Sequence, residues 1–104
     1  MNWQQKIIDA HTAVTNSVSH YAKMKSSRYF VWQEDGENTL ISDDTDRTKA
    51  ITGTTDLFTK KENDPWIEAF EQSMSNYGIA YYLNSVQYEE DTGFIHYEWV
   101  WEVI

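Results

Sequence analysis

Apolar residues near the N-terminus recur at steps of three and four positions. The repeating residues are Trp3, Ile7, Ala10, Val14, Val18 and Tyr21. This spacing places them on one face of an amphipathic helix, so the pattern predicts a helix over about residues 2–25. Several threonines and serines within this stretch are mediocre helix formers, so we expect the helix to depend on packing for its stability.

A second helix is predicted from Pro65 to about Tyr77. Its apolar stripe is formed by Trp66, Ile67, Phe70, Met74 and Tyr77. Asp64 can cap the free N–H groups of the first turn, and a proline fits the first helical position because its missing N–H has no partner there. Gly78 follows the stripe and is a typical residue at the end of a helix.

Two strands are predicted between these helices. The run Tyr29–Gln33 is short and apolar on both faces, and Glu34–Asn38 predicts a turn in which Gly36 adopts a positive φ. The next strand should lie within Lys49–Lys60, which is rich in threonine. Gly53 within that run predicts a bulge or bend.

The C-terminal third predicts a β-hairpin. One strand runs from Ile79 to Glu89, and the turn Glu90–Gly93 ends on a glycine suited to positive φ. The strand from Phe94 to Ile104 alternates in hydrophobicity. One face carries Ile95, Tyr97, Trp99, Trp101 and Val103, and the other carries Phe94, His96, Glu98, Val100 and Glu102. The second face is only half polar, which leaves room for a neighbouring protomer to cover it.

These elements predict a single α+β domain over residues 1–104. The expected order is α-β-β-α-β-β, with two helices flanking one four-stranded sheet that is mixed or antiparallel. The length of 104 residues fits one domain.

Charge and composition restrict the classes of partner. The chain has 17 acidic and 8 basic residues, for a formal net charge of −9, and it contains no cysteine. The acidic surplus argues against sequence-specific nucleic-acid binding and against an anionic membrane surface. No basic stretch followed by an apolar run begins the chain, and no run approaches the length of a membrane helix. We therefore expect neither a signal peptide nor a membrane partner.

No catalytic or metal-binding motif is recognisable, so we expect a protein that is not an enzyme and uses no cofactor. The aspartates around Asp43–Asp46 lack the glycine and distal glutamate of a calcium loop, and a solvated loop is the better interpretation. His11 and His20 are not spaced as a ligand pair, and we expect each at the surface or its boundary. His96 on its strand and the carboxylates at Glu89–Asp91 lack the converging partners of an acid–base site.

Aromatic residues are abundant, with 5 Trp, 7 Tyr and 4 Phe. Large rings fill a small core, but Trp and Tyr are also frequent at interfaces, and both alternatives stay open here. Lys23, Lys25 and Arg28 form a basic patch that could neutralise a helix C-terminus or contact an acidic neighbour. The residues we select as candidates for an interface are Lys25, Arg28, Trp32, Trp99 and Trp101.

Three stretches carry a resemblance to a known family. They run from Ser19 to Glu34, from Gly53 to Trp66 and from Leu83 to Trp99. They resemble small proteins encoded in the head-and-tail region of siphophages and prophages of Gram-positive bacteria. Within that group, the run of elements is similar to the tail terminator, or tail completion, proteins.

The resemblance implies a mixed sheet flanked by helices and assembly into a hexameric ring. Such a ring caps the tail tube, stops its growth and forms the face that joins the head, with DNA passing through its lumen. The implied partners are other copies of the chain, tail-tube proteins and head-connector proteins. The implied location is the virion, assembled in the cytoplasm of a bacterial host. Because the family has no catalytic motif, no functional residue is transferred from it.

A second hypothesis comes from the charge alone. A monomeric acidic binding or inhibitor module could mask a basic surface on a partner protein, and its binding would be sensitive to salt.

Overall fold

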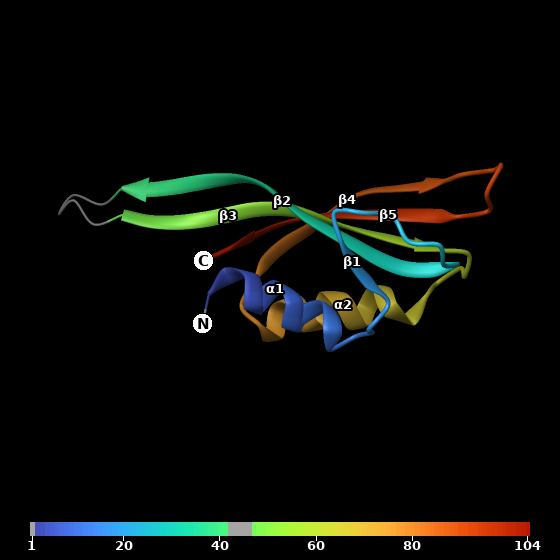
Figure 1. Cartoon of the computed structure of the whole chain (residues 1–104), viewed down its shortest axis with the longest axis horizontal. Coiled ribbons are helices and arrows are strands. Elements are labelled where there is room, and N and C mark those ends of the chain that lie inside the picture. The colour runs from blue at the N-terminus through green and yellow to red at the C-terminus, as the bar shows by residue number, and fades with distance from the viewer. Residues whose placement is uncertain (1, 42–46) are drawn as a thin grey trace.

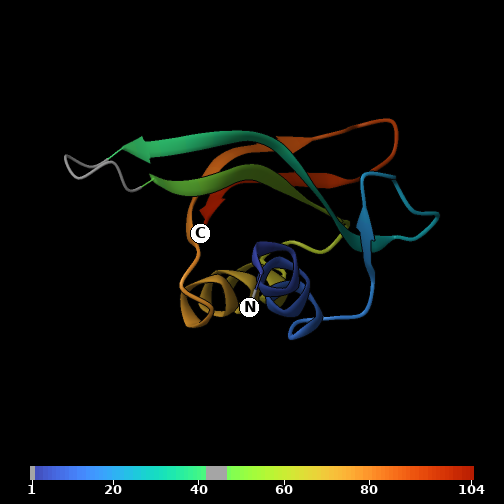
Figure 2. The ribbon, with the colours of Figure 1, turned by 60° about the vertical axis from the view of Figure 1, so that its left-hand side comes forward.

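A computed structural model gives the architecture of the chain and describes residues 2–41 and 47–104. The elements in order are α1 (Trp3–Thr12), β1 (Val18–His20), β2 (Arg28–Ile41), β3 (Arg47–Thr59), α2 (Pro65–Asn76), β4 (Ala80–Tyr88) and β5 (Ile95–Val103). Both helices lie on one face of the sheet, as Figures 1 and 2 show from two directions. The molecule is elongated, with extents of 53 × 23 × 22 Å.

The predicted four-stranded sheet and the order α-β-β-α-β-β are wrong. The structure has a five-stranded mixed sheet in the order β1-β2-β3-β5-β4, and its elements follow the order α-β-β-β-α-β-β. Strands β2, β3, β5 and β4 are joined in antiparallel pairs, whereas β1 pairs with β2 in parallel through Val18–His20. The additional strand comes from a segment that the helical spacing had assigned to the first helix.

Helix α1 ends at Thr12, and the residues after it form hydrogen bonds outside the helical pattern. The N–H of Ser17 donates to Oγ1 of Thr15 over 3.0 Å, and the Ser17 hydroxyl donates to the carbonyl of Arg28 over 3.0 Å. Serine and threonine side chains of this kind compete with helical hydrogen bonds. The released segment pairs with β2 instead of extending the helix.

The predicted turn at Glu34–Asn38 is also wrong. Strand β2 continues through it to Ile41, and the irregularity is a bulge between Glu34 and Gly36. Gly36 is not among the positive-φ glycines of the described chain, which are Gly78 and Gly93. The far half of β2 pairs only with β3, so the two strands form an arm beyond the rest of the sheet (Figure 1). The predicted loop at Asp43–Asp46 lies outside the described residues.

The second helix and the C-terminal hairpin confirm their predictions closely. Asp64 caps α2, Pro65 is its first residue, and Gly78 follows it with a φ of +69°. The turn between β4 and β5 ends on Gly93, whose φ is +78°. Local capping and turn chemistry account for these elements without long-range contacts.

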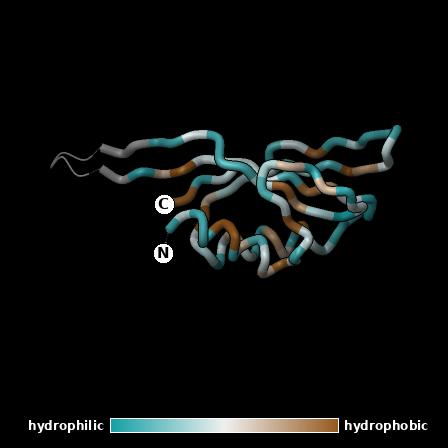
Figure 3. Tube along the Cα trace, viewed as in Figure 1, coloured by the Kyte–Doolittle hydropathy of each residue, from teal (hydrophilic) through white to brown (hydrophobic). Residues whose placement is uncertain are grey.

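The main core lies between the helices and the sheet. Its fully buried members include Ile7 and Phe70 from the helices and Phe30, Leu57 and Trp99 from the sheet. Figure 3 shows hydrophobic and hydrophilic residues alternating along much of the sheet, which is typical of strands with one covered face. A smaller cluster of Tyr29, Val31 and Phe58 lies on the opposite face, with Met24 and Phe94 packed against it.

Candidate assembly surface

Strand β4 forms one edge of the sheet and exposes most of the large apolar side chains on the described surface. Those exposed on β4 are Tyr82 at 58%, Leu83 at 42%, Val86 at 52% and Tyr88 at 66%. The register pairs Leu83 with Trp99, Val86 with Tyr97 and Tyr88 with Ile95. These three β4 side chains therefore share the face on which the helices pack, but no helix covers them. An exposed apolar patch of this kind is typical of an interaction site.

The same strand lacks the features that protect an open edge. Its sequence, AYYLNSVQY, has no charged residue and no proline over 9 residues. Edge strands of monomeric proteins usually carry lysine, proline or inward-pointing charges that prevent pairing with another chain. In a chain of net charge −9, an uncharged strand is the part of the surface where a second acidic molecule meets least repulsion.

The hydrogen-bonding pattern of the hairpin leaves donors free on this edge. The N–H of Glu89 donates to the carbonyl of Phe94 over 2.8 Å. Hydrogen-bonded and non-hydrogen-bonded pairs alternate along an antiparallel ladder. The N–H and carbonyl groups of Gln87, two residues before Glu89, therefore also point towards β5. The N–H and carbonyl groups of Val86 and Tyr88 consequently face the open edge.

Charged groups of opposite sign lie at one end of the sheet. The row Tyr88–Ile95–Thr59–Arg28 crosses four strands at that end. The acidic residues Glu89, Glu90 and Asp91 follow β4 there. The loop that joins β1 and β2, the strands of the other edge, carries Lys23 and Lys25. Figure 1 shows this loop and the β4–β5 turn at the same end of the molecule.

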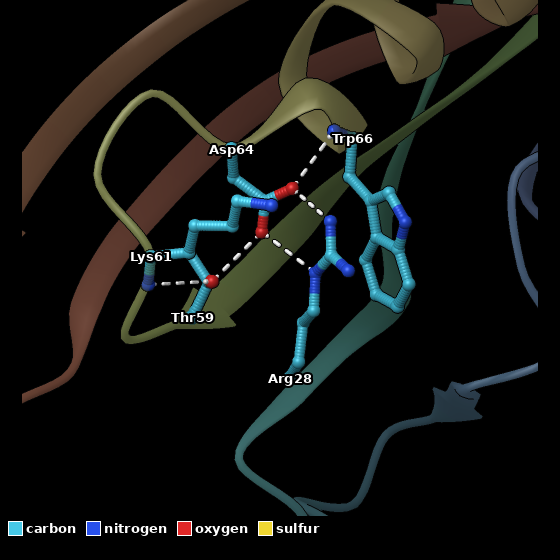
Figure 4. A network of polar contacts seen from close by, with 5 residues as sticks. All are labelled: Arg28, Thr59, Lys61, Asp64 and Trp66. Atoms are coloured by element: carbon cyan, nitrogen blue, oxygen red, sulfur yellow. Dashed lines mark hydrogen bonds and ion pairs between the residues drawn. The ribbon is translucent and has the colours of Figure 1, made fainter.

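Arg28, one of the predicted interface residues, is bound within the protomer (Figure 4). Its Nε donates to Oδ2 of Asp64 over 2.8 Å, a second guanidinium nitrogen contacts Oδ1, and the guanidinium lies 3.8 Å from the ring centroid of Trp66. Asp64 also accepts from the Thr59 hydroxyl at 2.7 Å and from the N–H of Trp66 at 2.9 Å. Burial opposes the ionisation of Asp64, but these hydrogen bonds outweigh it and hold the pKa of the carboxyl below its usual value.

The three predicted interface tryptophans lie in the interior of the protomer. Trp32, Trp99 and Trp101 are 4%, 0% and 1% exposed. The indole N–H of Trp99 donates to Glu71 over 2.9 Å, and that of Trp101 donates to Thr55 over 2.9 Å. Their part in an assembly stays a prediction, and the folded protomer leaves them little surface for it. Lys25 is exposed on the loop before β2.

His11 occupies an interior position that the helical spacing did not indicate. It is fully buried, with Nδ1 2.7 Å from the carbonyl of Ile7 and Nε2 2.9 Å from the hydroxyl of Thr55. Burial lowers the pKa of His11 from 6.5 to about 4, which the bond to Ile7 partly opposes. The expectation of a surface or boundary position is wrong for His11. His20, by contrast, is exposed and stacks on Trp32 at a centroid distance of 3.8 Å.

His96 lies on the sheet face opposite the helices. Its Nε2 is 3.0 Å from Oδ1 of Asp56, and its ring stacks on Phe58 at 4.3 Å. The hydrogen bond to Asp56 raises the pKa of His96, although partial burial opposes the shift. This pair stabilises the smaller cluster beside it. In the described ranges, no three His, Cys, Asp or Glu side chains are grouped as a metal site would require.

Neither helix combines the length and apolar character needed to cross a membrane, as judged over the described residues.

Comparison with known proteins finds a similarity in fold and none in sequence. No protein-family model matches it, and no curated protein sequence was found to be related. A solved chain from a structure titled "Virion of native gene transfer agent (GTA) particle" is similar in fold, with a TM-score of 0.53 and 12% identity. The match covers 96% of this chain and 88% of that chain. At this identity, the similarity shows that the two chains share a fold.

Sequence reasoning missed the open edge of β4 as a candidate surface. A signal was present, because Ala80–Tyr88 is a run of 9 residues with no charge in a strongly acidic chain. Recognising it required the strand order, since the sequence does not show whether β4 lies at the edge or in the middle of the sheet.

Proposed function

We propose that the protein is a structural component of a phage-like particle and acts as a tail terminator at the joint between head and tail. In this role it forms a homo-oligomeric ring that ends the tail tube and contacts the head connector. By analogy with the family that the chain resembles, the ring has six copies. Its place is the virion. The proposal is one of recognition and assembly, with no chemical step.

The observation that carries the proposal is the similarity in fold over nearly the whole chain to a chain of a virion particle. The sequence resemblance to tail terminator proteins points in the same direction. The open, uncharged edge of β4 adds a surface suited to repeated contacts between copies.

In a closed ring, the β4 edge of each subunit would contact a different surface of the next subunit. Heterologous contacts, in which one face of a subunit meets a different face of the next, generate rings when the rotation closes. The acidic surplus of each subunit would repel DNA phosphates and let DNA slide through a lumen without being held.

Two measurements test the proposal. Light scattering over a range of concentrations gives the molar mass, and a discrete oligomer is expected. Purified tail tubes incubated with the protein should then show capped ends in electron micrographs and should stop growing. A protein that stays monomeric in both experiments and leaves the tube ends open would overturn the assignment.

The formal net charge of −9 supports a second candidate, a monomeric acidic module that covers a basic partner surface. That alternative predicts a monomer at all concentrations and binding to a basic protein that weakens steeply as salt is added.

A further inference from the structure

The two edges of the sheet are complementary in direction. From the pairings, β2 and β5 run one way while β3 and β4 run the other way, and β1 is parallel to β2. Strand β4 at one edge is therefore antiparallel to β1 and β2 at the other edge. A second copy placed beside the first in the same orientation would continue the sheet across the junction as an antiparallel pair, the commoner kind.

The opposite edge is also open along most of its length. Strand β1 pairs with β2 only from Phe30 to Trp32, so no strand of the described chain pairs with β2 on that side from Gln33 to Ile41. The arm formed by β2 and β3 is two-stranded beyond the end of β5.

Placing two copies side by side in the same orientation also brings groups of opposite charge together. The acidic turn at Glu89–Asp91 follows the edge strand β4, and Lys25 is exposed in the loop that joins β1 and β2, the strands of the other edge. Both lie at the end of the sheet marked by the row from Tyr88 to Arg28. When one copy stands beside another, the acidic turn of the first comes next to the basic loop of the second. Lys23 also belongs to this loop, although its ammonium group lies over the ring of Phe58 at 5.4 Å.

We infer that the β4 edge binds the β1–β2 edge of a second copy of this chain, head to tail, with the turn at Glu89–Asp91 facing Lys25 of the neighbour. This inference rests on the proposed function, because it specifies the contact from which the ring is built. It also explains why an acidic protein carries an uncharged apolar edge strand.

A charge swap with a position control tests the contact. Lys25→Glu and Glu90→Lys should each raise the concentration needed for half-assembly about fivefold, because each places like charges at the junction. The double variant K25E/E90K should restore assembly. The control K25E/E68K has the same net charge, but Glu68 is exposed on α2, away from this edge, so assembly should stay weak. Circular dichroism confirms that each variant is folded.

Cross-linking tests the head-to-tail orientation independently, because the chain contains no natural cysteine. A short bismaleimide should join Lys25→Cys protein to Glu90→Cys protein when the two are mixed. It should not join Glu90→Cys protein to itself. Self-linking through residue 90 would indicate a two-fold contact between β4 strands and would overturn the inference.

The outcomes separate this inference from the function it rests on. Wild-type protein that assembles and caps tail tubes, together with K25E/E90K assembling as weakly as K25E/E68K, would overturn the inferred contact and leave the proposed ring intact. If wild-type protein neither assembles nor caps tubes, both are wrong.

Discussion

Nε2 of His11 lies 2.9 Å from the hydroxyl oxygen of Thr55, and this contact ties a fully buried imidazole of α1 to β3. The indole N–H of Trp101 donates to the same hydroxyl oxygen over 2.9 Å. The carbonyl of Ile7 can only accept, so in the neutral ring the proton of His11 is on Nδ1. Nε2 of His11 must then accept, and Nδ1–H donates to the carbonyl of Ile7. This chain of bonds joins α1 to β3 and β5 and is complete only when His11 is neutral.

The free energy of unfolding should therefore fall when the pH is lowered from about 6.5 to about 4. In this window the unfolded state binds a proton at residue 11 and the folded state does not, because the pKa of His11 is about 4 when folded and 6.5 when exposed. The loss should amount to about 3 kcal/mol at the low end. Urea unfolding at a series of pH values measures it. His11→Asn should flatten this slope.

His96 should titrate in the opposite sense. Its pKa is raised in the folded state, chiefly by the hydrogen bond to Asp56, so its stabilising effect is full below the unfolded pKa and is lost as the pH rises through the folded one. Histidine ring signals followed by NMR should show His96 titrating above 6.5 and His11 near 4. Asp56→Asn should bring the pKa of His96 down. An unchanged value would contradict the bond as the cause.

Asp64→Ala should lower the free energy of unfolding by about 3 kcal/mol, since it removes a helix cap and leaves the Arg28 guanidinium without its partner. The matched control is Asn2→Ala, which removes the cap of α1, where the Asn2 side chain accepts from the N–H of Gln5. That change should cost about 1 kcal/mol. Chemical denaturation compares the two, and equal losses would show that the ion pair adds nothing to the cap.

Gly53→Ala should destabilise the fold by about 2 kcal/mol through overpacking. A Cβ at this position would lie 2.3 Å from Cη2 of Trp101 and 2.4 Å from the carbonyl oxygen of Gln33. Gly36→Ala is the control, because its new Cβ would meet only the Thr52 hydroxyl at 2.9 Å, and that side chain can rotate. Thermal unfolding of the two variants measures the difference. Equal melting temperatures would contradict tight packing of Trp101 over Gly53.

Val86→Pro should abolish assembly while leaving the protomer folded. The N–H of Val86 faces the open edge, so proline removes a donor to a neighbouring copy without breaking the bonds to β5. Val86→Thr keeps the N–H and the branched shape, and it should still assemble. Light scattering gives the molar mass of each, and circular dichroism reports folding. If the proline variant is unfolded, Val86→Lys provides the same test through charge on the edge.

The sequence by itself determined the elements that depend on neighbouring residues. Asp64 and Pro65 begin α2, and glycines in the left-handed region end that helix and close the β4–β5 hairpin. These signals act over a few residues, because caps and turns satisfy nearby backbone groups. The alternation along β5 likewise separated the side chains of its two faces.

Only the tertiary structure decided where α1 ends, how far β2 extends and which tryptophans are buried. The segment at Val18–His20 became a strand because β2 offered it an open edge, and Arg28 turned inward because folding brought Asp64 beside it, 36 residues along the chain. The strand order also made β4 an edge and left its apolar side chains exposed. Each of these outcomes depends on a partner distant in sequence, and local propensity carries no information about such partners.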